Sequence, residues 1–320
     1  MKFTNQTHIE GLIYDHTLKE RVTGENSKNP GVTYINGKIS IATDDAISNI
    51  VDVNYTYVTA TTSKGKANST YTFLKNVIDG VHGSVVGVGA DKAKKVRIDS
   101  ALGLNEFYVA NSEDPNGEPE LVSAKRNEGG FIHPIAELNP DENTRNTFTV
   151  DFLISGVKHV DADPERELPE KAKIKGLIFD FRGAVLPVEF TAIHPDAISY
   201  FEGLGATNKE PIFTQVWGNQ VSTTVMSRKT VESAFGPSKV VETSRPNKDF
   251  VITGARPELY SWDDENTITA KDLATKLADR ETYLATVKSN YLEYQANKNK
   301  AAATPQNSAF SNVSNGGFNF

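Results

Sequence analysis

The sequence predicts a mainly β protein in which two similar small domains follow one another and a helix comes last. Three observations support this fold class. A glycine-centred strand, a second strand and a short helix closed by glycine occur in the same order twice along the chain. The strand segments are rich in Val, Ile, Thr and Tyr, which favour sheets. A helical pattern of apolar residues begins only at residue 270.

The repeat itself is the first element to justify. The first copy contains residues 34–39, 51–56 and 71–80, and the second contains residues 173–178, 185–191 and 199–203. Gly37 and Gly176 hold equivalent places, and the second copy has the shorter hairpin loop. A duplication of this length indicates two tandem domains rather than a solenoid of short repeats.

In the first domain, turn formers such as Pro30 and Gly31 separate segments that alternate with period two. We expect Val51, Val53, Tyr55 and Tyr57 to share the core-facing row of one strand. A short helix should start at a cap formed by Asn68 or Ser69. The predicted strands are residues 8–22, 32–43, 50–60, 95–100, 105–110, 120–126 and 130–135.

An acidic stretch with a proline at residues 137–146 is predicted to link the two domains. From residue 270 to about residue 297, apolar residues recur at helical spacing, and Thr269 with Asp272 resembles a capping box. The predicted strands of the second domain are residues 147–160, 172–181, 184–193, 211–217, 220–227, 239–244 and 248–254.

The strand order in each copy, with one helix between the third and fourth strands, matches the small Greek-key barrel called the OB-fold. The sequence therefore predicts two tandem OB-like barrels, a C-terminal α-helix and a disordered tail. The predicted boundaries are residues 1–140, 141–262, 263–300 and 301–320.

Composition excludes several classes of protein. The 320 residues are 38% hydrophobic and contain no cysteine, so disulfides, thiolate zinc sites and a cysteine nucleophile are excluded. No stretch approaches the ~20 apolar residues of a membrane span. Residues 1–6 lack the apolar core of a signal peptide. We expect a cytoplasmic protein.

The formal net charge is −7, which at first argues against a nucleic-acid partner. Most of the excess lies at residues 137–170, where nine acidic and three basic residues occur. Basic residues cluster elsewhere along the chain, and local potential decides whether a groove attracts phosphates. The charge balance therefore leaves nucleic-acid binding open.

OB-folds commonly bind single-stranded nucleic acid on one face of the barrel. Here basic clusters lie beside aromatic residues, and stacking one base on an aromatic ring contributes ~1–3 kcal/mol. Solvated surface lysines and core aromatics are the alternative interpretation of the same pattern. The candidate nucleic-acid-binding residues are Lys64, Lys66, Tyr71, Lys92, Lys94, Lys95, Arg97, Phe107, Lys125, Arg126, Lys173, Lys175, Trp217, Arg228 and Lys229.

Signals for catalysis are weak. Residues 83–92 are glycine-rich but lack the Gly-Lys-Ser/Thr ending of a phosphate loop, so a hairpin is the favoured interpretation. Asp161, Asp163 and Glu165 have the spacing of a divalent cation site, although a solvated acidic loop is favoured. The six histidines show no metal-ligand spacing, and no serine has a nucleophile-elbow context. We expect no catalytic residue, metal or cofactor.

The polar segment at residues 301–320 is predicted to be flexible and ends in Gly-Gly-Phe-Asn-Phe. Two aromatic side chains and a free carboxylate are typical of a docking peptide. Phe318 and Phe320 are therefore predicted to dock a partner protein, the alternative being two incidental phenylalanines.

Four runs, at residues 29–45, 53–59, 235–240 and 249–255, resemble tailed-phage proteins of the single-stranded DNA-binding type. The resemblance covers most of residues 8–265. It implies OB-folds joined to a mobile tail that recruits replication enzymes and competes for the DNA groove. Residues 301–320 contain no Asp or Glu, so only hydrophobic docking by Phe318 and Phe320 carries over.

Three hypotheses follow. The favoured one is a non-catalytic protein of phage replication or recombination that coats single-stranded DNA in the host cytoplasm and recruits partners through its tail. The second is an assembly protein that forms homo-oligomers through the helix at residues 270–297. The third is an enzyme acting on nucleic acid through Asp161 and Asp163.

Overall fold

The computed structural model describes residues 3–25, 27–114, 117–164, 168–231, 235, 239–265 and 267–303. Within these ranges, the side chains of residues 223–231, 239–247 and 299–303 are not described. The tail predicted at residues 301–320 was placed too early, because residues 301–303 still belong to the C-terminal helix, and the rest of it, including Phe318 and Phe320, lies outside the described residues.

The first five long strands close into a ring. β1 pairs with β3 and β5, β3 pairs with β4, β4 runs parallel to β6, and β6 pairs with β5. β2 extends the ring along β3. The elements are β1 (Asn5–His16), β2 (Lys19–Val22), β3 (Thr33–Ala42), β4 (Ile50–Thr59), α1 (Ser69–Ile78), α2 (Val85–Val88), η1 (Ala90–Lys92), β5 (Lys95–Val109) and β6 (Glu120–Pro134).

The second set of strands repeats this order. β7 pairs with β8 and β10, β8 pairs with β9, β9 runs parallel to β11, and β11 pairs with β10. The elements are η2 (Glu142–Thr144), β7 (Asn146–Val160), β8 (Lys171–Phe179), β9 (Val185–Ala192), α3 (Pro195–Gly203), β10 (Ile212–Val231), β11 (Lys239–Ala255) and α4 (Ala270–Ala303).

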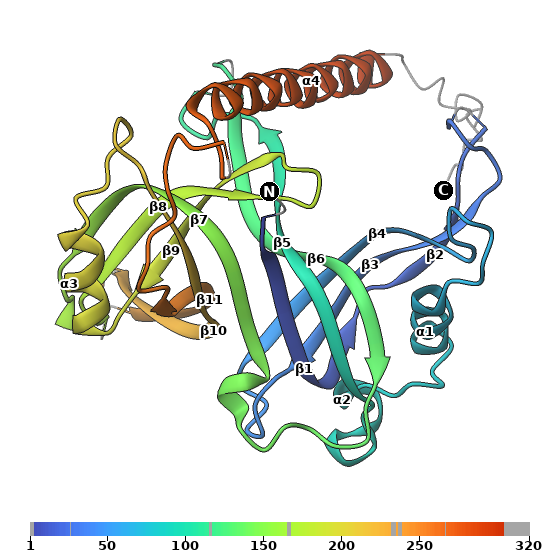
Figure 1. Cartoon of the computed structure of the whole chain (residues 1–320). Coiled ribbons are helices and arrows are strands. Elements are labelled where there is room, and N and C mark those ends of the chain that lie inside the picture. Colours follow the sequence, from blue (N-terminus) through green and yellow to red (C-terminus); the bar gives the residue numbers. More distant parts are fainter. Residues whose placement is uncertain are drawn as a thin grey trace, which may run out of the picture. The chain divides into compact units, whose positions relative to one another are not determined.

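Both rings have the strand order and the single parallel pair of the OB-fold. In each ring a helix follows the third strand, α1 in the first and α3 in the second, and lies beside the strands (Figure 1). The predicted fold class, mainly β with tandem OB-like barrels and a C-terminal helix, is confirmed. The predicted domain boundaries remain a prediction.

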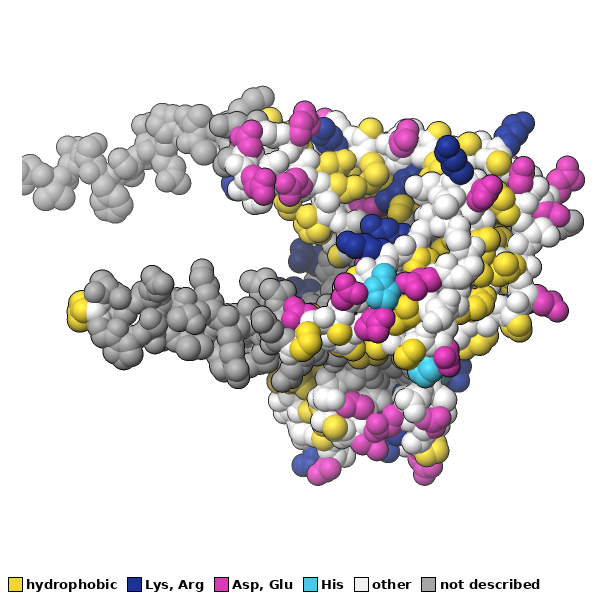
Figure 2. All heavy atoms as spheres, turned by 90° about the vertical axis from the view of Figure 1, so that its left-hand side faces the viewer, with side chains coloured by type: hydrophobic (Ala, Val, Ile, Leu, Met, Phe, Trp, Pro, Cys, Tyr) yellow, Lys and Arg dark blue, Asp and Glu magenta, His cyan; other side chains and the backbone are white. Residues whose placement is uncertain are grey.

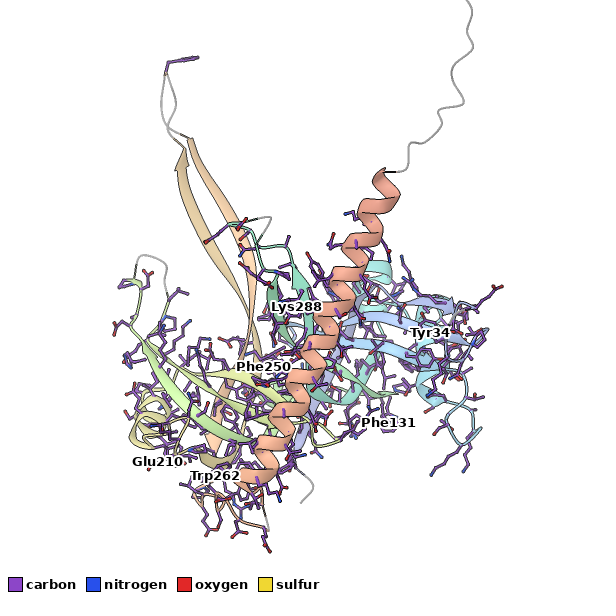
Figure 3. The ribbon with its side chains drawn as sticks, turned by 90° about the horizontal axis from the view of Figure 1, so that it is seen from above. Tyr34, Phe131, Glu210, Phe250, Trp262 and Lys288 are labelled. Atoms are coloured by element: carbon purple, nitrogen blue, oxygen red, sulfur yellow. The ribbon has the colours of Figure 1, made fainter. Side chains whose placement is uncertain are left out.

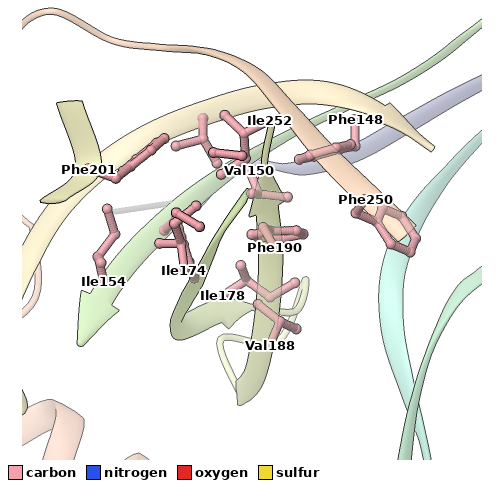
Figure 4. Close-up of a cluster of buried hydrophobic side chains, with 14 of the residues drawn as sticks. Phe148, Val150, Ile154, Ile174, Ile178, Val188, Phe190, Phe201, Phe250 and Ile252 are labelled. Atoms are coloured by element: carbon pink, nitrogen blue, oxygen red, sulfur yellow. The ribbon is translucent and has the colours of Figure 1, made fainter. Parts of the chain in front are cut away.

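Each barrel has its own hydrophobic core. In the first, inward residues of β1, β3 and β4, such as Ile9, Ile39 and Val53, are fully buried. In the second, Phe148, Phe190 and Phe250 pack ring against ring, as Figure 4 shows. Burial of each large side chain contributes about 1.5–3 kcal/mol to the stability of the fold, so each barrel is stabilised by its own core.

The predicted helix starts are confirmed. Asn68 caps α1, because its side-chain oxygen accepts a hydrogen bond of 3.1 Å from the Thr70 amide. At α4, the Asp272 amide donates to the Thr269 hydroxyl at 3.0 Å, and that hydroxyl bonds the Asp272 carboxylate at 2.8 Å. The Thr269 side chain therefore caps α4, while the Asp272 carboxylate binds the Thr269 hydroxyl where a full capping box would bind the Thr269 backbone amide.

Several predicted strand limits were wrong. The strand expected at residues 8–22 ends at His16 and resumes at Lys19. Four pairs of short predicted strands are continuous, as β5, β6, β10 and β11. Of two glycines in these strands, Gly218 falls in a predicted break, and both Gly130 and Gly218 admit close strand contacts rather than turns. A Cβ on Gly130 would lie 1.8 Å from the Asp99 carbonyl oxygen, and one on Gly218 would lie 1.9 Å from that of Val251.

The glycine-rich segment at residues 83–92 is not a hairpin. It forms the one-turn helix α2 and the 3-10 helix η1. Ser84 caps α2 by accepting from the Gly87 amide, and Gly89 ends it with a φ of 85°. Local helix capping, rather than strand pairing, therefore satisfies the hydrogen-bonding groups of this backbone segment.

A buried polar joint connects the barrels. Asn127 on β6 and Gln220 on β10 exchange two side-chain hydrogen bonds of 2.7 and 3.0 Å. Asn49 donates to the Gln220 carbonyl oxygen at 3.0 Å and accepts from the Ser222 amide at 2.8 Å. Since an unpaired buried amide is costly, this joint fixes the two barrels in one register.

The chain divides into two compact units. The first contains both barrels, as Met1–Asn105 and Ala124–Leu277, and the second contains Glu106–Ser123 and the described residues from Ala278 onward. Within the second unit, Arg280 on α4 binds both carboxylate oxygens of Glu106, and Lys288 pairs with Glu118. Within the described residues, no helix is long and apolar enough to cross a membrane.

Candidate nucleic-acid interface

The outward face of β3 and β4 is polar, because successive side chains of a strand alternate between its two faces. Ile39, Ile41 and Val53 point into the first core. Their neighbours Lys38, Ser40 and Asp52 lie on the outer face and contact one another. This face corresponds to the second and third strands of an OB-fold, where such barrels hold ligands.

Two tyrosines form a platform on the same face. The Tyr34 and Tyr57 rings have centroids 4.7 Å apart and planes tilted by 39°. Tyr57 is 50% exposed, so its predicted place in the core row with Tyr55 was wrong. Figure 3 shows Tyr34 among the strands of the first barrel.

A register shift explains the exposure of Tyr57. Gly37 pairs with Tyr55 and Ile35 pairs with Val58, so β4 has one extra residue between these two pairs. Such a bulge moves the following side chains to the other face. Gly37 has a φ of 131°, and a Cβ there would lie 2.5 Å from the Thr17 carbonyl oxygen. Only glycine fits without strain.

Basic side chains surround this platform. β2 contributes Lys19 and Arg21, and the Arg21 guanidinium donates to the Asn36 side chain at 3.0 Å. Tyr34 pairs with Thr59, so the loop that carries Lys64 and Lys66 begins at the platform's end of the strands. Both lysines are exposed. The loop with these two predicted residues thus starts at the strand end that carries two aromatic residues left out of the prediction.

Charged side chains of the second barrel adjoin this face in two groups, one at Asp52 and one at Asp249, and they come from neighbouring residues of β11. Lys38 and Lys248, from β3 and β11, both bind the Asp52 carboxylate. The next residue along β11, Asp249, pairs with Lys173 of β8 at 2.9 Å and with Lys125 of β6 at 3.8 Å. Farther along β8 and β9, Lys175 lies 3.9 Å from Glu189.

We call these residues the charge row: Lys38, Asp52, Lys248, Asp249, Lys125, Lys173, Glu189 and Lys175. It contains five lysines and three carboxylates. It therefore carries a net positive charge in a protein whose formal net charge is −7. Such a local excess is what attracts phosphates.

The two aspartates of the row stay ionised well below neutral pH. Burial alone raises the pKa of Asp52, but hydrogen bonds from Lys248 and Ser40 and the charges of both lysines outweigh it and hold the pKa below 3.8. Burial also raises the pKa of Asp249, but hydrogen bonds from Thr191 and Lys173 outweigh this effect and lower the pKa. Two fixed anions are therefore part of the row.

Lys125 has a structural contact in addition to its charge. Its ammonium donates to the Glu189 carbonyl oxygen and lies 5.1 Å from the Phe250 ring centroid and 5.6 Å from that of Phe190. Burial lowers the pKa of Lys125, partly offset by the charge of Asp249. This predicted binding residue of the first barrel thus reaches the core aromatics of the second.

Other predicted residues lie away from this face. Lys92, Lys94, Lys95 and Arg97 belong to η1, to β5 or to the link between them, and β5 pairs with β1 and β6 rather than with β3 or β4. Arg97 binds Asp99 at 2.9 Å through its guanidinium. The structure does not bring these four together with the tyrosine platform, and their role in binding remains a prediction.

The remaining predicted residues are dispersed. The Tyr71 hydroxyl on α1 donates to Glu20, and Arg126 pairs with Glu128 at 2.9 Å. Trp217 is partly exposed, and its ring lies over Gly254, where a Cβ would be 2.4 Å from the indole nitrogen. Phe107 belongs to the second unit, and the side chains of Arg228 and Lys229 lie outside the described residues.

The described residues contain no group of three His, Cys, Asp or Glu side chains that could hold a metal, so they do not form the cation site that was the alternative interpretation of Asp161, Asp163 and Glu165. Glu165 lies outside the described residues. Asp161 is instead 3.4 Å from His159, which also contacts Glu170 at 3.2 Å and Glu202 at 2.7 Å. Figure 2 shows acidic side chains gathered around a histidine on the face that carries α3.

Sequence reasoning missed Tyr34, Tyr57, Lys38 and Lys248. One signal was available: Tyr34, Asn36, Lys38 and Ser40 alternate with the apolar residues of the same strand, so they form one outward row. The exposure of Tyr57 depends on a bulge, and the place of Lys248 depends on how the barrels meet. Neither feature has a local sequence signal.

Fold and face together define a tandem OB-like β protein with an aromatic and basic outer surface. A family model described as YorF matches residues 4–290, and the chain belongs to this YorF family. A search of curated proteins finds no match.

One similar solved structure is a deletion mutant of the single-stranded DNA binding protein from Thermus aquaticus. It is 11% identical, aligns with a TM-score of 0.43, and the alignment covers 82% of this chain and 98% of that one. A likeness at this level carries no argument about fold or function. The fold assignment rests on the strand pairing alone.

Proposed function

We propose that this protein binds single-stranded DNA without catalysing a reaction, along the outer face of β3 and β4 and onward over the charge row. The observation that carries the proposal is the Tyr34–Tyr57 platform, in which Tyr57 is half exposed, together with lysines of both barrels that meet beside the same face. Aromatic platforms stack bases of any sequence, and lysines neutralise the phosphates between them.

Single strands suit this face better than duplexes. The tyrosine rings need an unstacked base as their partner, and a duplex keeps its bases stacked inside. Every base has a face that can stack on a tyrosine ring, so we propose binding that tolerates any sequence. Lys64 and Lys66, on the loop that starts beside the platform, would add phosphate contacts.

A role in phage DNA replication or recombination is the setting that the sequence resemblance implies. In that setting the protein coats single strands in the host cytoplasm and recruits replication proteins. Phe318 and Phe320 are the residues proposed to dock such partners, and they lie outside the described residues.

The experiment is a titration of the full chain against a labelled oligo-dT of about 30 nucleotides and a duplex of equal length. Replacing Tyr34 and Tyr57 by alanine should weaken single-strand binding. A protein that binds both ligands equally, or that binds the single strand unchanged after both substitutions, contradicts the proposal.

A second candidate function, self-association, has one observation in its favour. Tyr283, Leu292 and Tyr294 of α4 are about half exposed in the second unit. Light scattering of the full chain tests it. Oligomers that dissociate when these three residues become serine would support assembly, and a monomer at all concentrations would contradict it.

A further inference from the structure

Asp52 lies in a set of donors that suits a phosphate as well as a carboxylate. Its Oδ2 atom accepts from Lys38 at 3.2 Å and from Lys248, and its Oδ1 atom accepts from the Ser40 hydroxyl at 2.6 Å. Two ammonium groups and a hydroxyl converge on one small anion. Phosphate oxygens accept from the same donors, since both anions form charge-assisted hydrogen bonds.

The donors come from both barrels. Lys38 and Ser40 belong to β3, whereas Lys248 belongs to β11. Asp52 is therefore at the crossing from the tyrosine platform to the second barrel. A strand that follows both must place its backbone there.

Asp52 and its lysines remain accessible. The Lys38 side chain is 39% exposed and that of Lys248 is 45% exposed, while Asp52 itself is 22% exposed. An incoming phosphate can reach both ammonium groups without unfolding the barrels. Asp249 differs, because the side chains of its partners Lys125 and Lys173 are only 22% and 21% exposed.

We propose that Asp52 is an internal competitor for the DNA backbone: its carboxylate holds the lysine pair Lys38 and Lys248 in the free protein and gives the pair up to a phosphate when a strand binds. This inference rests on the proposed function. It assigns to Asp52 the regulation of affinity, and to Lys38 and Lys248 the phosphate contact at the barrel junction.

The competition has a measurable consequence. Each phosphate that a lysine neutralises steepens the fall of log K with log salt by about 0.7 for a single strand. Asp52→Asn keeps the size of the side chain but frees the lysine pair. We expect this variant to bind oligo-dT about 3- to 10-fold more tightly near physiological salt, with a salt slope steeper by about 1.

The matched control is Asp79→Asn. Asp79 pairs with Lys75 at 2.7 Å on α1, away from the outer face of β3 and β4, and its removal changes the net charge by the same amount. We expect affinity to change by less than 2-fold in this control, because long-range charge effects are screened within about 10 Å at moderate salt. An equal gain in both variants would mean that net charge alone acts, and would overturn the proposal.

The lysines are tested in the same titration. Combining Lys38→Gln and Lys248→Gln with Asp52→Asn should remove the whole gain, because no charged donor to a phosphate then remains at the junction. If the gain persists in the triple variant, the lysine pair is not the phosphate site and the proposal is wrong.

Two further outcomes separate this inference from the proposed function. Absence of binding by the unmodified protein refutes the function itself, whereas binding that Asp52→Asn leaves unchanged refutes only the competition. Asp52→Ser is the second variant if Asp52→Asn does not fold, and the same increase is expected. If both variants unfold, the contacts of Asp52 are needed for folding, and the competition is refuted.

Discussion

Replacing Asp249 by asparagine should destabilise the protein without touching either hydrophobic core. Asp249 accepts from Lys173 at 2.9 Å and from the Thr191 hydroxyl at 2.6 Å, and it lies 3.8 Å from Lys125. The substitution keeps the size of the side chain and removes its charge. Two lysines with little access to water then lose the carboxylate that they share most closely, and Glu189, 3.8 Å from Lys173, remains.

The expected cost follows from burial. The Asp249 side chain is 16% exposed, and neither lysine side chain exceeds 22%, so solvent screens these pairs only weakly. Removing one partner of a buried pair costs 3–5 kcal/mol when burial is complete, and residual exposure lowers that figure. We expect about 3 kcal/mol, a large share of the 5–15 kcal/mol that stabilises a typical domain.

Urea unfolding measures this cost as a drop in the transition midpoint at unchanged slope. Lys125→Met is the companion variant, because it removes a buried charge and leaves an apolar chain beside Phe190 and Phe250. That variant should stay within about 1 kcal/mol of the unmodified protein. If Asp249→Asn costs under 0.5 kcal/mol, or Lys125→Met costs more than Asp249→Asn, the counterion argument fails.

The pH dependence adds an independent check on Asp249. Its folded-state pKa is below 3.8, so its contribution is present above pH 3.8 and is lost as the pH falls through the folded value. The stability difference between the unmodified protein and Asp249→Asn should therefore shrink below about pH 3.8. A difference that is constant from pH 7 to pH 2 would exclude the ion pairs as its source.

Three further predictions concern binding, backbone and pH. Tyr57→Ala should weaken oligo-dT binding by about 1–3 kcal/mol in anisotropy titrations, whereas Tyr200→Ala on α3 should not; equal losses would dismiss the platform. Gly37→Ala should lower the free energy of unfolding, measured with urea, by about 2 kcal/mol through its left-handed φ and the clash with Thr17, while Gly156→Ala, with open space around it, should be neutral. The hydrogen bond that His159 donates to the Glu202 carboxylate, together with nearby carboxylates, raises the pKa of His159 above 6.5, so this stabilisation is present below pH 6.5 and is lost as the pH rises through the folded value. Glu202→Gln should reduce that dependence in thermal melts, and an unchanged profile would exclude the contact.

The fold was predictable from the chain because its signals are local and occur twice. Gly37 and Gly176 mark equivalent strands, and both barrels have the same pairing order. The caps at Asn68 and Thr269 depend on residues a few positions apart. Such short-range chemistry can be found in one sequence without knowing the tertiary structure.

The candidate site was only partly predictable, for reasons that are tertiary. Tyr57 is exposed because one extra residue in β4 shifts the register, and strict alternation with Tyr55 had placed it in the core. Lys125 looked like a free surface lysine, yet it lies over the aromatic rings of the other barrel. Lys38 and Lys248 meet at Asp52 only because Asn127 and Gln220 fix how the barrels join.

The central claim, that one outer face spanning both barrels holds a single strand, is tested most directly by one titration. The full chain is titrated against labelled oligo-dT of about 30 nucleotides and against duplex at several salt concentrations. The account predicts a clear preference for the single strand, with affinity that falls as salt rises. Binding that is equal for both ligands, or insensitive to salt, would contradict it.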